Sequence, residues 1–292
     1  MKIGFVFTNY NNAKFTRAAV ASISRGKSGD DALIVVVDNG SSPDDVAALK
    51  GIGREFARVH LILNSENVGY FRGLNIGIGF LRRQTSPPFE YIVVGNNDLV
   101  FPEDFLPRMQ EHVDLFRSHA VVAPDMVTLD GVHQNPHVLF PITRMRKLVW
   151  DLYFHSYGAA VAIRHIAKVT RAFSVRRENA ASSELHLTPG PIEQGYGACY
   201  ILGPVFFQNF ERLCAPTFIM QEEFFLSEQL NSVGQMVYYD PRVVVHHHDH
   251  ATVDALPNRR QWELSQEAHQ VYKRYLRLSP KERLSLISSE TR

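Results

Sequence analysis

Short apolar runs alternate with amphipathic stretches over the first hundred residues of the chain. Four of the runs are rich in β-branched or aromatic residues, and polar, turn-forming residues follow each one. We therefore predict strands at residues 3–8, 32–37, 59–64 and 91–94 and helices at residues 13–24, 43–56 and 73–82. Repeated strand–helix units with continuous apolar strands indicate an α/β fold with a mostly parallel sheet and helices on both faces.

The pattern changes after about residue 141, where basic and apolar residues interleave and Asp151 is the only acidic residue before Glu178. This pattern predicts one or two basic amphipathic helices. An α/β pattern then resumes, with a helix near 204–213, a strand at 243–245 and a polar helix near 258–278. We accordingly divide the chain into an α/β half (1–140), a helical insertion (141–190), a second half (191–255) and a C-terminal helix and tail (256–292).

Composition restricts the class of protein. The 292 residues are 45% hydrophobic and 21% charged, which is an ordinary globular balance, and the net charge of +1 argues against a nucleic-acid partner. The only two cysteines, Cys199 and Cys214, favour a reducing compartment and exclude a disulfide framework. The first apolar run is too short for a signal peptide, and no run reaches the ~18–20 residues of a membrane span. We expect a cytoplasmic protein, with peripheral association at the inner face of the cell membrane as the alternative to a freely dissolved one.

Polar residues cluster where the predicted strands end, which is where ligands bind in parallel sheets. After the second strand, the carboxylate of Asp38 could accept a hydrogen bond from a nucleobase, and Gly40 would permit a close backbone approach. The alternative is a plain turn between a strand and a helix. Before the third helix, Asn67, Gly69, Arg72 and Asn75 form a suitable place for a pyrophosphate or sugar hydroxyls. Here the alternative is that the glycines only turn the chain.

Two further clusters suggest a cation and a base. Asp98, after Asn96 and Asn97, offers a hard oxygen ligand for Mg²⁺ or Mn²⁺, and His246 at another strand end could be a second ligand. A histidine in that place can also be merely packed or solvated. The pair Glu222–Glu223 opens a helix beside apolar residues that would raise a carboxyl pKa, which suits a general base. It can equally be an ordinary acidic helix start.

Taken in order, these motifs resemble the inverting family-two glycosyltransferases of the GT-A fold, in particular the rhamnosyltransferase-like branch of bacterial surface-polysaccharide assembly. The resemblance covers residues 3–110 and 195–252. It is carried by Thr8-Asn9-Tyr10, Val-Asp-Asn-Gly-Ser-Ser at 37–42, the Asn-x-Gly-x-x-x-Gly-x-Asn element at 67–75, Asn-Asn-Asp at 96–98, Gly-x-Gly-Ala at 195–198, the acidic pair at 222–223 and Val-Val-Val-His at 243–246.

The resemblance implies transfer of a sugar from a nucleoside-diphosphate sugar to a glycan acceptor, which in this branch is expected to be lipid-linked, in bacterial capsule or O-antigen assembly. It would make residues 1–140 the nucleotide-sugar half and 191–255 the acceptor half. Asn96 replaces the family's first metal-motif carboxylate, and Glu–Glu replaces its Glu–Asp pair, so Glu222 stays open as the base. The implied roles are donor binding for Thr8, Asn9, Tyr10, Asp38, Asn39, Asn67, Gly69, Arg72, Asn75, Asn96 and Asn97, metal binding for Asp98 and His246, and base catalysis for Glu223 or Glu222.

Two other functions stay open at this stage. A sugar-1-phosphate nucleotidyltransferase would carry a glycine-rich loop with a basic residue after the first strand, where this chain has Thr8-Asn9-Tyr10-Asn11-Asn12. An inactive relative would bind sugar nucleotides without turnover. For the stretch from Arg144 to Arg177, we expect docking on an anionic membrane surface. The alternative there is a helix pair that packs on the core.

Overall fold

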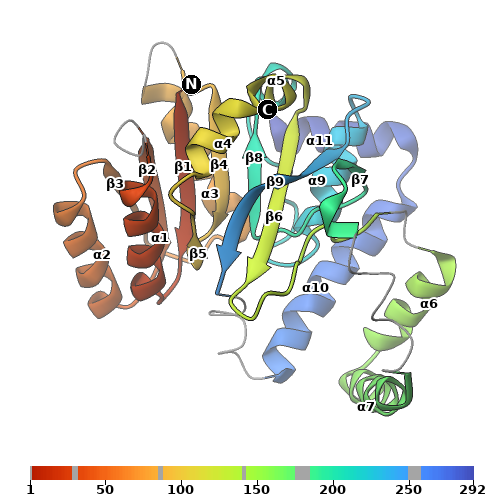
Figure 1. Ribbon diagram of the computed structural model, residues 1–292. Coiled ribbons are helices and arrows are strands. Elements are labelled where there is room, and N and C mark those ends of the chain that lie inside the picture. The colour runs from red at the N-terminus through yellow and green to blue at the C-terminus, as the bar shows by residue number, and fades with distance from the viewer. Residues whose placement is uncertain (1, 28–31, 85–87, 140–142, 175–184, 249–257) are drawn as a thin grey trace.

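The computed structural model describes residues 2–27, 32–84, 88–139, 143–174, 185–248 and 258–292. Within these ranges one nine-stranded sheet forms the centre of the molecule, in the order β3-β2-β1-β4-β8-β6-β9-β5, and β7 pairs with β9 (Figure 1). The strands are β1 (Ile3–Asn9), β2 (Leu33–Asn39), β3 (Val59–Asn64), β4 (Tyr91–Asn96), β5 (Leu99–Val100), β6 (Val121–Thr128), β7 (Gly190–Ile192), β8 (Cys199–Leu202) and β9 (Val237–His247).

The sheet is mostly parallel, as predicted. β3, β2, β1 and β4 run parallel, β8 is antiparallel to β4 and β6, and β6 and β9 are again parallel. The four strands predicted in the first hundred residues are present, and the predicted strand at 243–245 lies within β9. Strands from the ranges 1–140 and 191–255 alternate in this sheet, because β8 lies between β4 and β6.

Helices cover both faces of the sheet because neighbouring strand residues point to opposite sides. Phe5 and Ile34 belong to one apolar cluster, and Val6 and Val35 belong to the other. The first cluster is completed by α1 (Ala13–Arg25), α2 (Pro43–Glu55), α4 (Phe105–Glu111) and α5 (Val113–Ser118), and the second by α3 (Tyr70–Gln84), α8 (Pro204–Asn209), α9 (Glu222–Asn231), α10 (Asn258–Arg277) and α11 (Pro280–Thr291).

The start of α3 differs from the prediction, because the helix begins at Tyr70 and not at residue 73. Gly69 precedes it with φ 93°, and a β-carbon there would collide with the carbonyl oxygen of Phe218. That oxygen accepts a hydrogen bond of 2.9 Å from the backbone N–H of Tyr70. Only glycine permits this contact, which joins the start of α3 to the segment that precedes α9.

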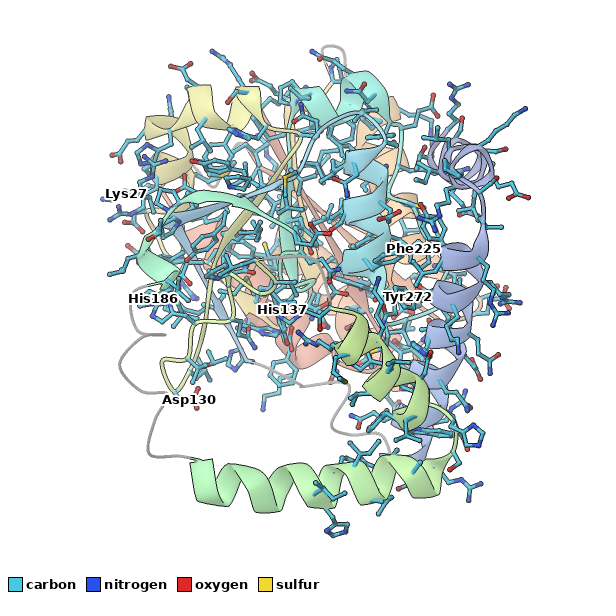
Figure 2. All side chains as sticks on the ribbon, turned by 90° about the vertical axis from the view of Figure 1, so that its right-hand side faces the viewer. Lys27, Asp130, His137, His186, Phe225 and Tyr272 are labelled. Carbon is cyan, nitrogen blue, oxygen red and sulfur yellow. The ribbon has the colours of Figure 1, made fainter. Side chains whose placement is uncertain are left out.

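The insertion forms α6 (Arg144–Tyr153), α7 (Tyr157–Ser174) and the short 3₁₀ helix Leu185–Leu187. Figures 1 and 2 show α7 at the periphery, away from the sheet, and α6 beside α10. The indole of Trp150 lies edge-on to Tyr272 of α10, with ring centroids 6.2 Å apart. Within the described ranges, the helices are all too short or too polar to cross a bilayer.

Candidate active site

Polar side chains join the ends of β1, β2 and β4 in one buried network. Asn9 donates hydrogen bonds to the carboxylates of Asp38, over 3.0 Å, and Asp45, over 2.7 Å. The side-chain oxygen of Asn9 accepts a hydrogen bond of 2.8 Å from the hydroxyl of Thr16 and one of 3.0 Å from the side-chain amide of Asn97. Asn9 and Asn97, both expected at the donor, therefore hold the strand ends together.

Asp38 and Asn39 lie in the turn after β2. Asp38 is 1% exposed and accepts a hydrogen bond of 3.1 Å from the backbone N–H of Ser41. Asn39 donates to the carbonyl oxygen of Gly69 over 3.1 Å, which connects this turn to α3. At the neighbouring end of β1, Tyr10 is 41% exposed. The hydrogen bonds that Asp38 and Asn39 make within the protein are structural. Contact of Asp38 with a nucleobase stays a prediction.

The polar residues of α3 contact protein backbone. Arg72 donates through Nε to the carbonyl oxygen of Ala215 over 3.1 Å. Asn75 both donates to and accepts from the backbone of Leu213, each over 2.8 Å. The side-chain oxygen of Asn67 accepts from the N–H of Gly69 over 3.0 Å. These bonds hold the 213–215 segment on α3 and shape the start of the helix, and the expected contact of these residues with a donor stays a prediction.

Asp98 lies in the loop between β4 and β5 and faces a histidine at the end of β9. Oδ1 of Asp98 lies 3.2 Å from Nε2 of His247, and the two side chains are 5% and 2% exposed. The other ring nitrogen of His247, Nδ1, lies 2.8 Å from Oε1 of Gln134. Because an amide oxygen only accepts hydrogen bonds, this contact places a proton on Nδ1 of His247 and orients the ring with Nε2 toward Asp98.

A divalent cation fits this pair. Oδ1 of Asp98 is buried and accepts no hydrogen bond from the described residues. A carboxylate oxygen and an imidazole nitrogen are both common metal ligands, and Gln134 orients the imidazole as a supporting ligand partner does in metal sites. In the described part of the chain, no three His, Cys, Asp or Glu side chains gather as a complete metal site. Two protein ligands are nevertheless sufficient for Mg²⁺ when substrate phosphates and water supply the rest.

The histidine that lies beside Asp98 is His247, whereas the sequence suggested His246 as the second metal ligand, and that role of His246 stays an untested prediction. Successive residues of a strand point to opposite sides, so only one of the two can face Asp98. The antiparallel pairing of β5 and β9 sets Leu99 opposite His247 and so brings His247 beside Asp98. His246 and His248 line an open hollow of about 530 Å³, together with Val127.

The acidic pair begins α9. Met220 and Gln221 precede it with positive φ angles of 71° and 66°, a conformation that non-glycine residues adopt rarely and often near functional sites. Glu222 is 5% exposed, and burial together with the charge of Glu223 raises its pKa to about 8. Glu222 is therefore mostly protonated at neutral pH. Glu223 is half-buried, and its carboxylate packs against Gly197.

Tyr196 and His137 connect the acidic pair to Asp98 and His247. The ring of Tyr196 lies edge-on to His247, with centroids 5.8 Å apart, and to His137, with centroids 5.4 Å apart. Burial lowers the pKa of His137, the charge of Glu223 opposes this effect, and Arg146 adds to it. The sequence did not predict His137, Gln134 or the role of Tyr196, since all three lie in segments between the helices and strands.

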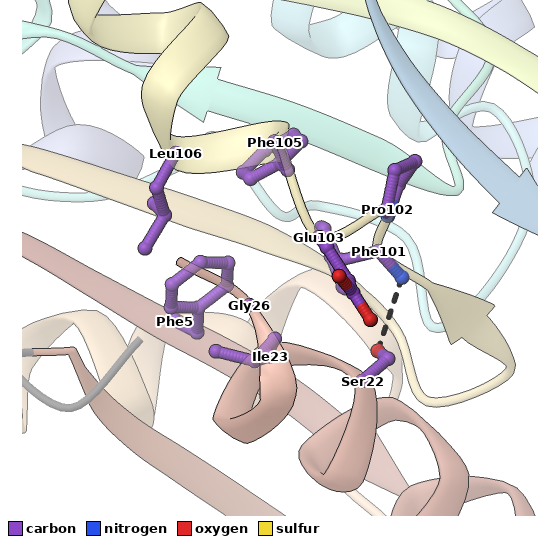
Figure 3. A pocket seen from close by; sticks show the side chains of 9 residues that line it. All are labelled: Phe5, Ser22, Ile23, Gly26, Phe101, Pro102, Glu103, Phe105 and Leu106. Carbon is purple, nitrogen blue, oxygen red and sulfur yellow. Dashed lines mark hydrogen bonds between the residues drawn. The ribbon is translucent and has the colours of Figure 1, made fainter. Parts of the chain in front are cut away.

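A second hollow lies at the other side of the sheet and has no room for a substrate. Figure 3 shows its lining, which includes Phe5, Phe101 and Phe105, and the hydrogen bond of 3.0 Å from the Phe101 N–H to the hydroxyl of Ser22. Its volume is about 10 Å³, roughly that of one water. The candidate active site is therefore the region at the strand ends that contains Asp98, His247 and Glu223.

The fold is similar to that of two solved structures. The first is GalNAc-T7 with UDP, GalNAc and Mn²⁺, with a TM-score of 0.55 and 13% identity over 84% of this chain and 43% of that one. The second is S. aureus TarS 1–349, with a TM-score of 0.50 and 11% identity over 97% of this chain and 77% of that one. This chain thus spans less than half of the GalNAc-T7 chain. A search of curated protein sequences gives no match.

The mostly parallel sheet with helices on both faces is a GT-A fold. The sequence model described as Glycosyl transferase family 2 matches residues 5–180. The chain belongs to this family.

Proposed function

We propose that the protein is an inverting, metal-dependent glycosyltransferase in which Glu223 is the general base and Asp98 and His247 hold Mg²⁺ or Mn²⁺. One arrangement carries this proposal. Asp98 lies 3.2 Å from His247, the rings of His247 and His137 both lie edge-on to Tyr196, and the charge of Glu223 acts on His137. A carboxylate–imidazole pair and a second carboxylate are thus linked through Tyr196 and His137.

Glu223 is a better candidate for the base than Glu222. A base must be ionised and must reach the acceptor hydroxyl. Glu222 is buried and, with its pKa raised to about 8, largely neutral, whereas Glu223 is partly accessible. Glu223 takes the proton of an acceptor hydroxyl as that oxygen bonds to the anomeric carbon, while the bond from this carbon to the diphosphate oxygen breaks. The displacement inverts the anomeric configuration and releases a nucleoside diphosphate.

The cation site supports departure of the diphosphate. A divalent cation bound there supplies positive charge against the charge that develops on the leaving group. Asp98 provides a carboxylate oxygen, His247 an imidazole nitrogen, and Gln134 fixes the imidazole tautomer. GalNAc-T7, whose fold this chain shares, was solved with UDP, GalNAc and Mn²⁺, which supports the use of a divalent metal in general.

For the donor, we propose that the nucleobase lies over the turn that contains Asp38, with Thr8 and Tyr10 at the neighbouring end of β1. For the acceptor, we propose a lipid-linked glycan in bacterial capsule or O-antigen assembly, and a rhamnosyltransferase-like donor preference. These finer assignments rest on the ordered motifs of the sequence, above all Asn-Asn-Asp at 96–98 and the acidic pair at 222–223.

The decisive experiment measures donor binding and product together. UDP-, GDP- and dTDP-sugars are screened by thermal shift with Mn²⁺, with Mg²⁺ and with EDTA, and reactions of the stabilising donor are analysed for released nucleotide. We expect metal-dependent stabilisation and release of a nucleoside diphosphate. Release of pyrophosphate from a nucleoside triphosphate and a sugar 1-phosphate would instead identify a nucleotidyltransferase. Stabilisation without turnover on any acceptor would identify an inactive sugar-nucleotide-binding relative.

A further inference from the structure

Helix α6 has an inner and an outer apolar face. The inner face packs on α10, where the indole of Trp150 and the ring of Phe154 lie 6.5 Å and 4.5 Å from His269, centroid to centroid. The outer face carries large apolar side chains that the described residues leave uncovered. These are Met145, Leu148, Val149 and Leu152, with exposed fractions of 70%, 63%, 44% and 57%.

Basic side chains border this outer face. Arg146 is exposed, Lys147 is half-exposed, and Arg164 is exposed on α7, where Ile166 adds an apolar side chain that is 63% exposed. Arg146 lies over the ring of Trp150 and Arg164 over that of Tyr157, at 5.4 and 5.7 Å from the ring centroids. Such basic residues beside apolar ones are typical of helices that lie at a lipid–water interface.

The acidic residue of this stretch is turned inward. Asp151 is the only Asp or Glu between residues 141 and 177. Its Oδ1 lies 3.0 Å from Nε2 of His269 and 3.0 Å from Nζ of Lys273, both on α10. These contacts pair the negative charge within the fold. The outer face of α6 therefore presents apolar and basic groups with no carboxylate from its own stretch of chain.

We propose that α6 and α7 dock this protein on an anionic lipid bilayer, with the exposed apolar residues of α6 inserted among the lipids and the basic residues at the headgroups. Charge complementarity favours a bilayer over a second copy of the chain. Two copies facing each other through this surface would oppose the like charges of Arg146 and Arg164, whereas anionic headgroups neutralise them. The peripheral position of α7 in both views leaves this side accessible (Figures 1 and 2).

Docking would bring the bilayer near the active site. Arg146, in the first turn of α6, acts electrostatically on His137, and His137 interacts in the same way with Glu223. Figure 2 shows His137 beside the start of α6. If the proposed function holds, an acceptor carried by a lipid would meet the base at the membrane surface. This last step alone rests on the proposed function, and binding to lipid does not.

The test is flotation with vesicles of phosphatidylglycerol and phosphatidylcholine, without donor, so that its result is independent of catalysis. We expect the wild type to float at low salt and to be released toward 1 M salt, where the Debye length falls to about 3 Å. Leu148→Glu/Leu152→Glu should lower binding by at least about tenfold. Lys147→Glu/Arg164→Glu should also weaken it. The matched controls Leu284→Glu and Arg274→Glu/Lys281→Glu, on α11 and α10, should bind as the wild type does.

The proposal is overturned if the wild type ignores anionic vesicles at low salt, or if it binds pure phosphatidylcholine equally well. It is also overturned if both α6–α7 variants, folded by circular dichroism, bind like their controls. A second copy as the partner would appear in light scattering as a wild-type dimer that Leu148→Glu/Leu152→Glu dissociates, and this result too rejects the bilayer. Catalysis by a protein that does not float would separate the failure of docking from that of the proposed function.

Discussion

Nε2 of His247 lies 3.2 Å from Oδ1 of Asp98, and both side chains are buried in a part of the sheet where neighbouring histidines point outward. This relationship defines which histidine should matter for metal binding. We expect His247→Ala to abolish the Mn²⁺ dependence of nucleotide affinity, because one of two protein ligands is lost. His246→Ala should leave it unchanged. Calorimetry with UDP, GDP and dTDP, each with and without Mn²⁺, measures the difference. Equal effects of the two variants would contradict the assignment.

Removal of the base should separate chemistry from binding. Glu223→Gln keeps the size of the side chain but cannot accept the acceptor's proton, so kcat should fall by about 10²–10⁴-fold. Donor affinity should stay within about twofold, because the proposed role of Glu223 is toward the acceptor hydroxyl and not toward the diphosphate. Steady-state kinetics and calorimetry test both statements. A variant with wild-type kcat would exclude Glu223 and return Glu222 as the base.

The raised pKa of Glu222 predicts how stability depends on pH. The folded protein holds a proton on Glu222 up to a pKa of about 8, whereas the unfolded chain loses it near pH 4.3. Between these values the folded state binds more protons, so the free energy of unfolding falls as pH rises, by at most about 1.4 kcal/mol per pH unit. Glu222→Gln stays neutral and should lose this part of the pH dependence.

Urea unfolding of both proteins at pH 5, 6, 7 and 8 measures this effect. The difference between Glu222→Gln and the wild type should grow in favour of the variant as pH rises. Comparison at each pH cancels the titration of the histidines, which both proteins share. A constant difference over the range would mean that Glu222 ionises at the same pH in the folded and unfolded states.

The sequence predicted the first half of the sheet well and the cation pair only in part. Runs such as residues 32–37 are continuous and rich in β-branched residues, so the sequence alone predicts a strand that is buried on both faces of the sheet. Strand β6 was not predicted, since Pro124 and Asp125 interrupt its apolar pattern, and neither was α11. Alternation along β9 could have shown that His246 and His247 cannot both face Asp98. Their pairing with β5, however, is a long-range contact that no local pattern reports.

The residues around the base were harder to predict for the same reason. His137 and Gln134 belong to a loop without periodicity, and they reach the site only because Asn135 holds the loop with two hydrogen bonds, to Pro124 and Tyr196, each of 2.8 Å. Conversely, Arg72 and Asn75 are residue types that suit binding of a diphosphate. In this fold they donate hydrogen bonds to backbone carbonyl oxygens of the 213–215 segment. Residue type and spacing indicate a chemistry, but they do not determine which groups the fold itself uses.

Asn75 offers a test of that distinction. Asn75→Ala removes two hydrogen bonds to the backbone of Leu213 and leaves that N–H and C=O unpaired, so stability should fall by about 1–3 kcal/mol. Nucleotide affinity measured well below the melting temperature should be unchanged. Asn209→Ala is the matched control, because it loses only one exposed bond, to Val205. Weaker nucleotide binding with intact stability would restore the role at the donor that the sequence suggested.

Gly197 should control the position of the base. A β-carbon at this residue would collide with the carboxylate of Glu223, which is the mobile end of a side chain and can move away. Gly197→Ala should therefore fold with stability close to that of the wild type but displace Glu223 from the acceptor, with a loss of about tenfold or more in kcat, since small misplacements of catalytic groups are costly. Gly190→Ala is the control, because a β-carbon there meets no atom within 4 Å. Thermal unfolding and steady-state kinetics of both variants test this prediction, and full activity of Gly197→Ala would show that the contact with Gly197 does not set the catalytic position of Glu223.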